Sequence, residues 1–423
     1  MFRYRTLLDE LVTHVENKKV TILVGPRQVG KTTLMKQLYE IFKNTYKCLF
    51  YDLDIPSQYL KLNTYESFIN NLKLEGYHDN GPLFVVFLDE FQRYPDMAIV
   101  MKNIADHHHN IKIYASGSSS LAIHASIQES LSGRKRIVYV YPLSFKEYLK
   151  FLQYDHLVEK IDHLVSISSD NLKQLLPELF SELNQFLIYG GYPEVALAKN
   201  EKEKKEILAS IFDLYVKKDL MDFLKIDKIR QVKTIIEFLS INNGQQINYN
   251  QISQIVGLDD KTVKNYIEIL KETFIVFVQR PWFTNKNKEL IKLPKIYFID
   301  NGVRNFFINN FTKIELRPDA SFLFEGFILS ECIKKGLPSD ALKYWRTRNK
   351  QEVDIIIDYG INLKIIEIKY KEIIKKSDLT GLFAFRRYYP QFSDIYCIAK
   401  STNKDCYGIP CFSPFDFDKI IVN

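Results

Sequence analysis

The segment Gly25–Thr32 constrains the fold of this chain more than any other segment. It reads GPRQVGKT and fits the pattern G-x-x-x-x-G-K-[ST]. The residues before it, VTILV at 20–24, have the composition of a buried strand, and TTLMKQLYEIF at 32–42 has that of a helix. A strand, a glycine-rich turn and a helix in this order predict a parallel α/β domain that binds a phosphate group at the amino end of the helix.

The chemistry of this loop predicts what its residues do. Gly25 and Gly30 let the backbone turn so that successive N–H groups face the phosphates. Lys31 would reach the phosphate oxygens, and the Thr32 hydroxyl would complete the shell of a Mg²⁺ ion. The residues expected to contact the nucleotide here are Gly25, Pro26, Arg27, Gln28, Val29, Gly30, Lys31, Thr32 and Thr33.

A second apolar segment, FVVFLDE at 84–90, ends in two acids. It is expected one strand–helix crossover downstream of the loop, where such a strand ends beside the bound phosphates. Asp89 would hold Mg²⁺ through water, and Glu90 would polarise the attacking water. The two acids therefore predict hydrolysis of the nucleotide in addition to binding.

Two more groups of residues are candidates for the same edge of the sheet. The strand IKIYASG at 111–117 delivers hydroxyl groups there, and either Ser116 or Ser118 would contact the γ-phosphate or the lytic water. A plain Ser/Gly turn explains that pattern equally well. Arg134, which follows Gly133, is either an arginine finger, in its own chain or on a neighbouring subunit, or a solvated basic residue.

The middle of the chain is predicted to be helical. Residues 144–223 form a helical lid, broken at Gly190-Gly191, where a helix–helix connection is favoured over a hinge or a nucleotide-facing turn. A helix, a turn at Gly257, a second helix capped by Asp259 or Asp260, and a strand then predict a winged helix-turn-helix. This module either reads DNA or docks proteins. Its outer face would carry Lys261, Thr262, Lys264 and Asn265.

The C-terminal region has acidic residues within two strands. Tyr344–Asp358 is predicted as one strand with Asp354 at its centre, and Lys364–Lys369 as a second strand with Glu367 and Lys369 on one face. On adjacent strands these residues form the constellation of the restriction-endonuclease-like nucleases. Asp354 and Glu367 would hold Mg²⁺, and Lys369 would orient or deprotonate the attacking water.

Glu325 lies upstream, in a helix that is apolar on most sides. A carboxylate there is costly to bury without a partner, and a metal site or Lys369 would provide one. The alternative for the whole acidic set is a solvated strand face, because acids and lysines are abundant in this chain.

The order of the motifs GPRQVGKTT, VFLDE, ASGSSS, SGR with YPLSF-x-EYL, and GGYPE resembles a family of predicted prokaryotic ATPases of the AAA+ superfamily. Members of that family carry a C-terminal restriction-endonuclease-like (PD-(D/E)xK) domain. The resemblance extends over nearly the whole chain. It implies the AAA+ fold, ATP as the nucleotide, and a nuclease relative whose four signature positions are present. It does not imply that the domain cleaves DNA.

Composition sets broad limits. No apolar run approaches the roughly 18 to 20 residues of a membrane-spanning helix, so no membrane partner is expected. The five cysteines are scattered, as in a reduced, cytoplasmic protein. A net charge of +7 is compatible with a nucleic-acid partner without arguing for one.

The expected fold class is α/β, in four units: an AAA+ P-loop core (1–143), a helical lid (144–223), a winged helix (224–290) and a restriction-endonuclease-like domain (291–423). The expected function is a Mg²⁺-dependent ATPase whose nucleotide state regulates a DNA-directed nuclease-like domain. The alternative is a nucleotide-dependent switch in signalling or defence, in which both C-terminal modules only bind partners. Those partners would be DNA, another protein or further copies of the chain.

Overall fold

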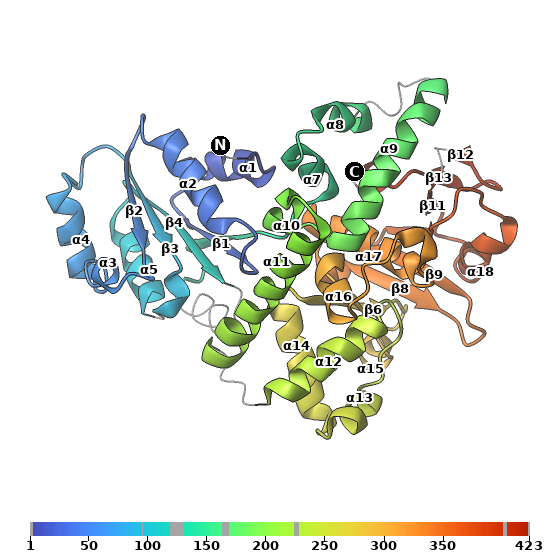
Figure 1. Cartoon of the computed structure of the whole chain (residues 1–423). Helices are drawn as coiled ribbons and strands as arrows, with labels where there is room; N and C mark the ends of the chain where they lie inside the picture. Colours follow the sequence, from blue (N-terminus) through green and yellow to red (C-terminus); the bar gives the residue numbers. More distant parts are fainter. Residues whose placement is uncertain are drawn as a thin grey trace.

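The computed structural model describes residues 3–94, 96–118, 131–162, 169–223, 228–400 and 404–421. Figure 1 shows an amino-terminal sheet domain (blue to cyan) on one side and a larger body on the other, with α11 (Glu201–Leu214) between them. No helix in these ranges is both long and apolar enough to cross a membrane.

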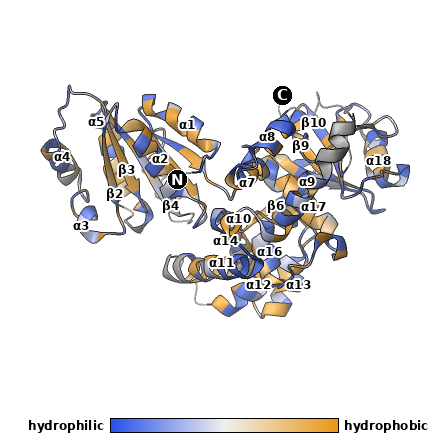
Figure 2. Cartoon of the chain, turned by 45° about the horizontal axis from the view of Figure 1, so that its top comes forward, coloured by the Kyte–Doolittle hydropathy of each residue, from blue (hydrophilic) through white to orange (hydrophobic). Residues whose placement is uncertain are grey.

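The amino-terminal domain is built on a five-stranded sheet in the order β2-β3-β4-β1-β5, in which every pair is parallel. Every residue of β1 and β3 is buried, and β3 is largely hydrophobic in Figure 2. Helices on both faces provide that burial, which confirms the parallel α/β prediction. The strands are β1 (Val20–Gly25), β2 (Lys47–Asp52), β3 (Phe84–Asp89), β4 (Ile111–Ser118) and β5 (Lys135–Tyr139). The helices are α1 (Leu7–Thr13), η1 (His14–Glu16), α2 (Lys31–Phe42), α3 (Pro56–Tyr59), α4 (Tyr65–Leu74), η2 (Phe91–Arg93) and α5 (Met97–His107).

The prediction that one crossover separates the loop from β3 was wrong. The chain makes β2 first, at the edge of the sheet, and β4 lies between β1 and β3. Asp89 therefore reaches the nucleotide site across an intervening strand. The carboxyl ends of parallel strands still meet at one edge of the sheet, so the predicted meeting of the motifs holds.

The region from 144 to 223 is helical where it is described. Its elements are α7 (Phe145–Phe151), α8 (Asp155–Asp162), α9 (Ser169–Tyr189), α10 (Pro193–Leu197), α11, and a π-helical segment η3 (Tyr215–Phe223). The break predicted at Gly190-Gly191 separates α9 from α10.

Three helices and a strand follow, in the predicted order. Gly257 ends α13 with φ 67°, and the Asp259 side chain accepts the Thr262 N–H, so Asp259 is the N-cap of α14. The elements are α12 (Ile229–Ile241), α13 (Tyr249–Val256), α14 (Asp260–Glu272), β6 (Val276–Pro281), α15 (Lys286–Ile291) and β7 (Lys295–Phe298). Strands β6 and β7 pair antiparallel, with α15 between them.

The C-terminal sheet has eight strands in the order β12-β13-β11-β10-β9-β8-β6-β7. Because β6 pairs with β8, this sheet runs across the division proposed at residue 290, which stays a prediction. The strands are β8 (Leu342–Arg346), β9 (Glu352–Asp358), β10 (Leu363–Lys369), β11 (Ile395–Ala399), β12 (Lys404–Asp405) and β13 (Pro410–Phe412). The helices are α16 (Asn301–Phe307), η4 (Ile314–Leu316), α17 (Ala320–Lys334), η5 (Ser339–Ala341), η6 (Lys376–Leu379), α18 (Thr380–Tyr388) and α19 (Asp418–Ile421).

The single strand expected over Tyr344–Asp358 is instead the hairpin of β8 and β9. The Thr347 N–H donates to the Gln351 carbonyl over 2.9 Å, and Lys350 has φ 62°. The polar run between the strands has no apolar residue to bury, so the chain turns there.

The connection between α9 and α10 contacts the C-terminal domain. Buried Asp300, the N-cap of α16, accepts the N–H groups of Gly191 at 2.7 Å and Val303 at 3.1 Å. Gly190 has φ +79°, and a Cβ atom there would lie 2.0 Å from Asp300 Oδ1. The helical region is therefore fixed to the C-terminal domain.

A cleft of about 1010 Å³ lies between β5 and the start of β6.

We expect Gly190→Ala to lower the free energy of unfolding by about 3 kcal/mol, because the new methyl group would collide with Asp300 as well as strain the backbone. Gly257→Ala is the matched control: its φ is also positive, but nothing lies within 4 Å of the new atom, so we expect about 1 kcal/mol. Thermal unfolding of the two variants measures the difference. Equal losses would mean that contact with Asp300 does not fix this junction.

Candidate functional sites

The loop from Gly25 to Thr32 joins β1 to α2, as its sequence predicts. A Cβ atom on Gly25 would lie 2.0 Å from the Val140 carbonyl, so no side chain fits there. Gly30 has φ +93° and is the N-cap of α2, which leaves the N–H groups of the first turn for a ligand. Gln28 is left-handed too, with φ 62°, which marks a strained backbone at a candidate site.

Lys31 is buried at the base of this loop. Its ammonium group donates to the Gly25 carbonyl at 2.9 Å and the Pro26 carbonyl at 2.8 Å. Burial lowers the pKa of Lys31, and the nearby carboxylates of Glu90, Asp219 and Asp89 oppose that effect. The lysine is thus held by the loop itself, in a position from which it can turn to a phosphate.

Arg5 holds the loop from outside. This buried arginine donates to the Val29 carbonyl at 2.9 Å, to Glu147 at 3.0 Å and to the Tyr141 carbonyl at 2.9 Å. One side chain near the amino terminus therefore connects the loop, the end of β5 and the first turn of α7. The sequence reading missed it, because a lone arginine near a terminus carries no motif.

Asp89, Thr32 and Ser116 come together at the carboxyl edge of the sheet. The Ser116 hydroxyl donates to Asp89, and the Thr32 hydroxyl is hydrogen-bonded to the same carboxyl group. Burial raises the pKa of Asp89, and these two hydrogen bonds lower it. The residues predicted to hold Mg²⁺ therefore face one another. Of the two candidate serines, Ser116 is placed here, and the Ser118 side chain lies outside the described residues.

Two side chains, Gln92 and Arg27, contact the Glu90 carboxylate at the carboxyl edge of the sheet. It accepts a hydrogen bond from Gln92, and its carboxylate lies 4.0 Å from the Arg27 guanidinium. Arg27 also donates to Asp219 over 3.0 Å. Thr33 is exposed on the first turn of α2. The carboxylate predicted to polarise water is thus paired with protein groups in this structure.

Arg134 is not part of the nucleotide site of its own chain. It precedes β5, whose residue Lys135 pairs with Val20 at the opposite end of β1 from Gly25. Five residues of extended chain, about 16 Å, separate the two ends. Arg134 instead pairs with Asp106. The alternative that Arg134 acts as a finger in its own chain is therefore wrong, because Arg134 lies at the amino ends of the strands and the phosphate-binding loop at their carboxyl ends.

A second cluster lies on β9 and β10, which pair antiparallel. The Lys369 ammonium contacts Glu367, and it lies 3.6 Å from the Asp354 carboxylate. Asp354 also accepts the Ile368 N–H over 2.8 Å. The sequence prediction that these three residues meet on adjacent strands is matched by these contacts.

The charges of this cluster act strongly on one another. Burial, and then the neighbouring Asp354, raise the pKa of Glu367. Burial lowers the pKa of Lys369, but Asp354 and Glu367 more than reverse this and raise it. Glu367 Oε2 is buried and has no hydrogen-bond partner in the described ranges, so it is available to a ligand.

Glu325 has a partner that the sequence reading did not identify. Its carboxylate accepts from Tyr297 and lies 3.2 Å from the Lys295 ammonium, which also lies 2.5 Å from Glu352. The ion pair of Glu325 is therefore formed by Lys295 and not by Lys369, and the alternative partner, a metal ion, stays a prediction. Lys295 lies in strand β7, in which every residue is buried. A lysine beside the apolar residues of such a strand needs a charged partner, and this was the signal in the sequence.

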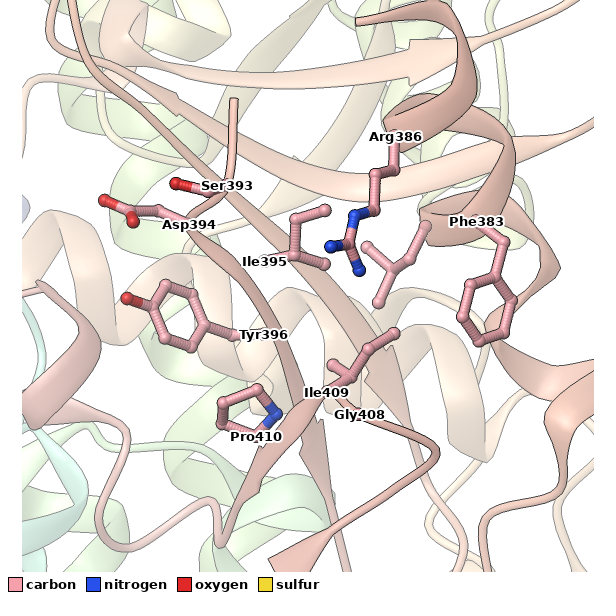
Figure 3. A pocket seen from close by; sticks show the side chains of 10 residues that line it. Phe383, Arg386, Ser393, Asp394, Ile395, Tyr396, Gly408, Ile409 and Pro410 are labelled. Carbon is pink, nitrogen blue, oxygen red and sulfur yellow. The ribbon is translucent and has the colours of Figure 1, made fainter. Parts of the chain in front are cut away.

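No three His, Cys, Asp or Glu side chains among the described residues gather closely enough to hold a metal ion. At the second cluster Lys369 takes that place between the two carboxylates. A separate hollow of about 200 Å³ lies near β11 and α18, and Figure 3 shows Arg386 reaching into it. It contains none of the predicted site residues.

Comparison with known families agrees with the first site. Residues 17–149 match the model described as an AAA domain. Residues 180–313 and 320–409 match two domains of unknown function, DUF8612 and DUF4143. Together with the parallel sheet and the loop, the first match makes the amino-terminal domain an ATP-binding AAA ATPase domain.

The relatives found by sequence are themselves uncharacterized. A protein of Methanocaldococcus jannaschii is 26% identical over 358 residues, which cover 84% of this chain and 75% of that protein. A protein of Haemophilus influenzae is 24% identical over 389 residues, which cover 88% and 87%. The similarity therefore extends well beyond the ATPase domain and brings no activity with it.

Solved structures match with low scores. The Walker-type ATPase of Pyrococcus abyssi is 14% identical, with 73% of this chain and 96% of that chain covered and a TM-score of 0.47. The RuvB Holliday junction branch migration motor of Thermotoga maritima is 14% identical, with 69% and 95% covered and a TM-score of 0.31. Neither score is high enough to establish a common fold over the aligned length.

We expect Lys295→Met to lower the free energy of unfolding by about 3 to 5 kcal/mol, because it leaves the buried Glu325 carboxylate without its cation. Glu352 also loses Lys295 but keeps its ion pair with Arg346. The double variant Lys295→Met/Glu325→Gln should recover part of this loss. Lys292→Met, at an exposed position just before β7, is the control and should melt as the wild type does. A melting temperature of Lys295→Met equal to that of the control would contradict the role of Lys295 as the cation that compensates Glu325.

Proposed function

We propose that this protein is a Mg²⁺-dependent ATPase whose nucleotide state controls a DNA-directed, nuclease-like C-terminal domain. The observation that carries the proposal is the pairing of β9 with β10. It places Lys369 against both Asp354 and Glu367, on two central strands of the sheet that also contains β6.

At the nucleotide site, Lys31 would exchange the Gly25 and Pro26 carbonyls for phosphate oxygens. Thr32 and Asp89 would hold Mg²⁺, which would neutralise charge on the phosphates. Glu90 would have to leave Arg27 and Gln92 before it could orient the attacking water. That requirement makes turnover depend on a rearrangement, as expected of a regulatory ATPase.

At the second site, Asp354 and Glu367 would hold the metal ion of a nuclease. The buried, unpartnered Glu367 Oε2 supports this, since it is a ligand atom without a protein partner in the described ranges. Lys369 would turn from the carboxylates to the attacking water or the phosphate. Burial raises the pKa of Glu325 beside them to about 7, and Lys295 partly opposes that rise. The metal ion would supply Lewis-acid stabilisation of the phosphate.

The arrangement of α13, α14 and the strands after them supports a winged helix-turn-helix. On the outer face of α14, Lys261, Lys264 and Asn265 are exposed, as a helix that enters the major groove requires. Thr262 instead donates its hydroxyl to Asp259, so we assign it to the helix cap.

One observation favours the alternative, a switch that binds partners without cleaving DNA. Lys369 is already paired with Glu367, and the nearby Lys295 with Glu325. A protein of this kind could keep the cluster as a buried structural ion network, with α14 as its docking surface.

We expect Lys31→Ala to weaken ATP binding by at least about tenfold, because the proposal has this lysine contact the phosphates directly. Glu90→Gln should bind ATP at least as tightly as the wild type but lower turnover by about 100-fold. Lys36→Ala, exposed on the same helix, is the control. Binding of a fluorescent ATP analogue and phosphate release measure the two effects. Unchanged binding in Lys31→Ala would overturn the ATPase proposal.

The nuclease proposal predicts that the wild type nicks supercoiled DNA in the presence of ATP and Mg²⁺, and that Asp354→Asn abolishes nicking while ATP turnover persists. Asp394→Asn, an exposed acid of the same domain, should cleave as the wild type does. Gel electrophoresis of the plasmid gives the readout. ATP turnover without cleavage under Mg²⁺ or Mn²⁺ would exclude the nuclease and favour the switch.

A further inference from the structure

A buried acid from the body of the molecule reaches the phosphate-binding loop. Asp219 lies 192 positions after Arg27 in the chain, and it accepts a hydrogen bond from the Arg27 Nε atom over 3.0 Å. Its residue is only 3% exposed. The acid belongs to η3, the π-helical segment that continues α11, and Figure 1 shows α11 running from the body toward the sheet domain. π-helical turns are rare and often occur at functional positions.

The Arg27 guanidinium is shared between two carboxylates. Besides Asp219 it faces Glu90, the acid proposed to orient water, at 4.0 Å. Both acids lie close enough to Lys31 to act on its charge. One arginine of the loop therefore neutralises two acids that sit next to the place where the phosphates would bind.

The segment that carries Asp219 is also tied to the helix proposed to bind DNA. At the start of η3, the Tyr215 hydroxyl is hydrogen-bonded to Thr273 Oγ1 over 2.9 Å. Thr273 is the C-cap of α14. Leu220, next to Asp219, is fully buried. A displacement of this segment would therefore act directly on the end of α14.

We propose that Asp219 is a positioning residue that senses the nucleotide: it holds Arg27 when no nucleotide is bound, and the nucleotide phosphates take Arg27 from it. The inference rests on the proposed ATP binding and adds how that binding is communicated to the body.

The physical reason is competition between anions for one guanidinium group. A phosphate carries more charge than a carboxylate and offers more acceptor oxygens to arginine, so it wins the contact. Asp219 is then a buried carboxylate without a cation, which is unfavourable. Segment η3 then moves until the Asp219 carboxylate is exposed to water, which removes this unfavourable energy. The ligand thus favours one of two arrangements because it interacts with them differently.

The first measurement is the affinity for a fluorescent ATP analogue with Mg²⁺. Asp219→Asn removes the competing charge with almost no change in shape, so the dissociation constant should fall by about tenfold. Asp213→Asn is the matched control, since Asp213 is an exposed acid on α11 and should bind as the wild type does. Asp219→Glu keeps the charge and should stay within about threefold of the wild type.

The second measurement is hydrogen–deuterium exchange of peptides covering residues 215–223, with and without a slowly hydrolysed ATP analogue. In the wild type, the nucleotide should speed up exchange of this segment. In Asp219→Asn, exchange should be fast without nucleotide and unaffected by it. Asp219→Glu should keep the wild-type response. The comparison of the wild type with and without nucleotide does not depend on how well any variant folds.

The outcomes separate the inference from the function on which it rests. If the wild type does not bind the ATP analogue, the proposed ATPase and this inference both fail. If it binds, but exchange of 215–223 does not respond and Asp219→Asn has the wild-type affinity, only the inference is overturned. An Asp219→Asn affinity below that of the wild type would also overturn it, since Asp219 would then assist binding.

Discussion

Charged side chains are buried or half-buried at both candidate sites, where little water solvates them, so each needs a partner supplied by the fold. Lys31 finds backbone carbonyls of its own loop, Arg27 finds Asp219, and Lys369 finds Glu367. A ligand that brings its own charge competes with these partners, so its binding changes which ion pairs and hydrogen bonds form at the site.

The same constraint explains how the parts of the molecule are joined. Asp300 fixes the turn after α9 to the C-terminal domain through backbone N–H groups, and β6 continues into the C-terminal sheet. The helical region and the C-terminal domain thus share a core. The ATPase sheet meets that body through contacts that include the pair of Arg27 with Asp219 and the hydrogen bonds of Arg5. Those contacts lie at the candidate nucleotide site.

Local patterns predicted much of this correctly. The strands of the amino-terminal sheet, the break after α9 and the cap of α14 follow from apolar runs, glycines and capping residues a few positions apart. The prediction failed where the outcome depends on distant segments. One alternative for Arg134 was a finger in its own chain, but the residue lies at the amino ends of the strands, away from the phosphate-binding loop. Lys369 was one predicted partner of Glu325, but the ion pair is formed by Lys295.

The sequence by itself determined the phosphate-binding loop and the acids that follow β3, because their chemistry depends on residues that are neighbours in the chain or end parallel strands of one sheet. It also determined that Glu367 and Lys369 share a face, since side chains two apart in a strand do. Only the tertiary structure decided which charge compensates which. Asp219 reaches Arg27, and Lys295 reaches Glu325, because packing brings together segments far apart in the sequence, and no local pattern encodes that distance.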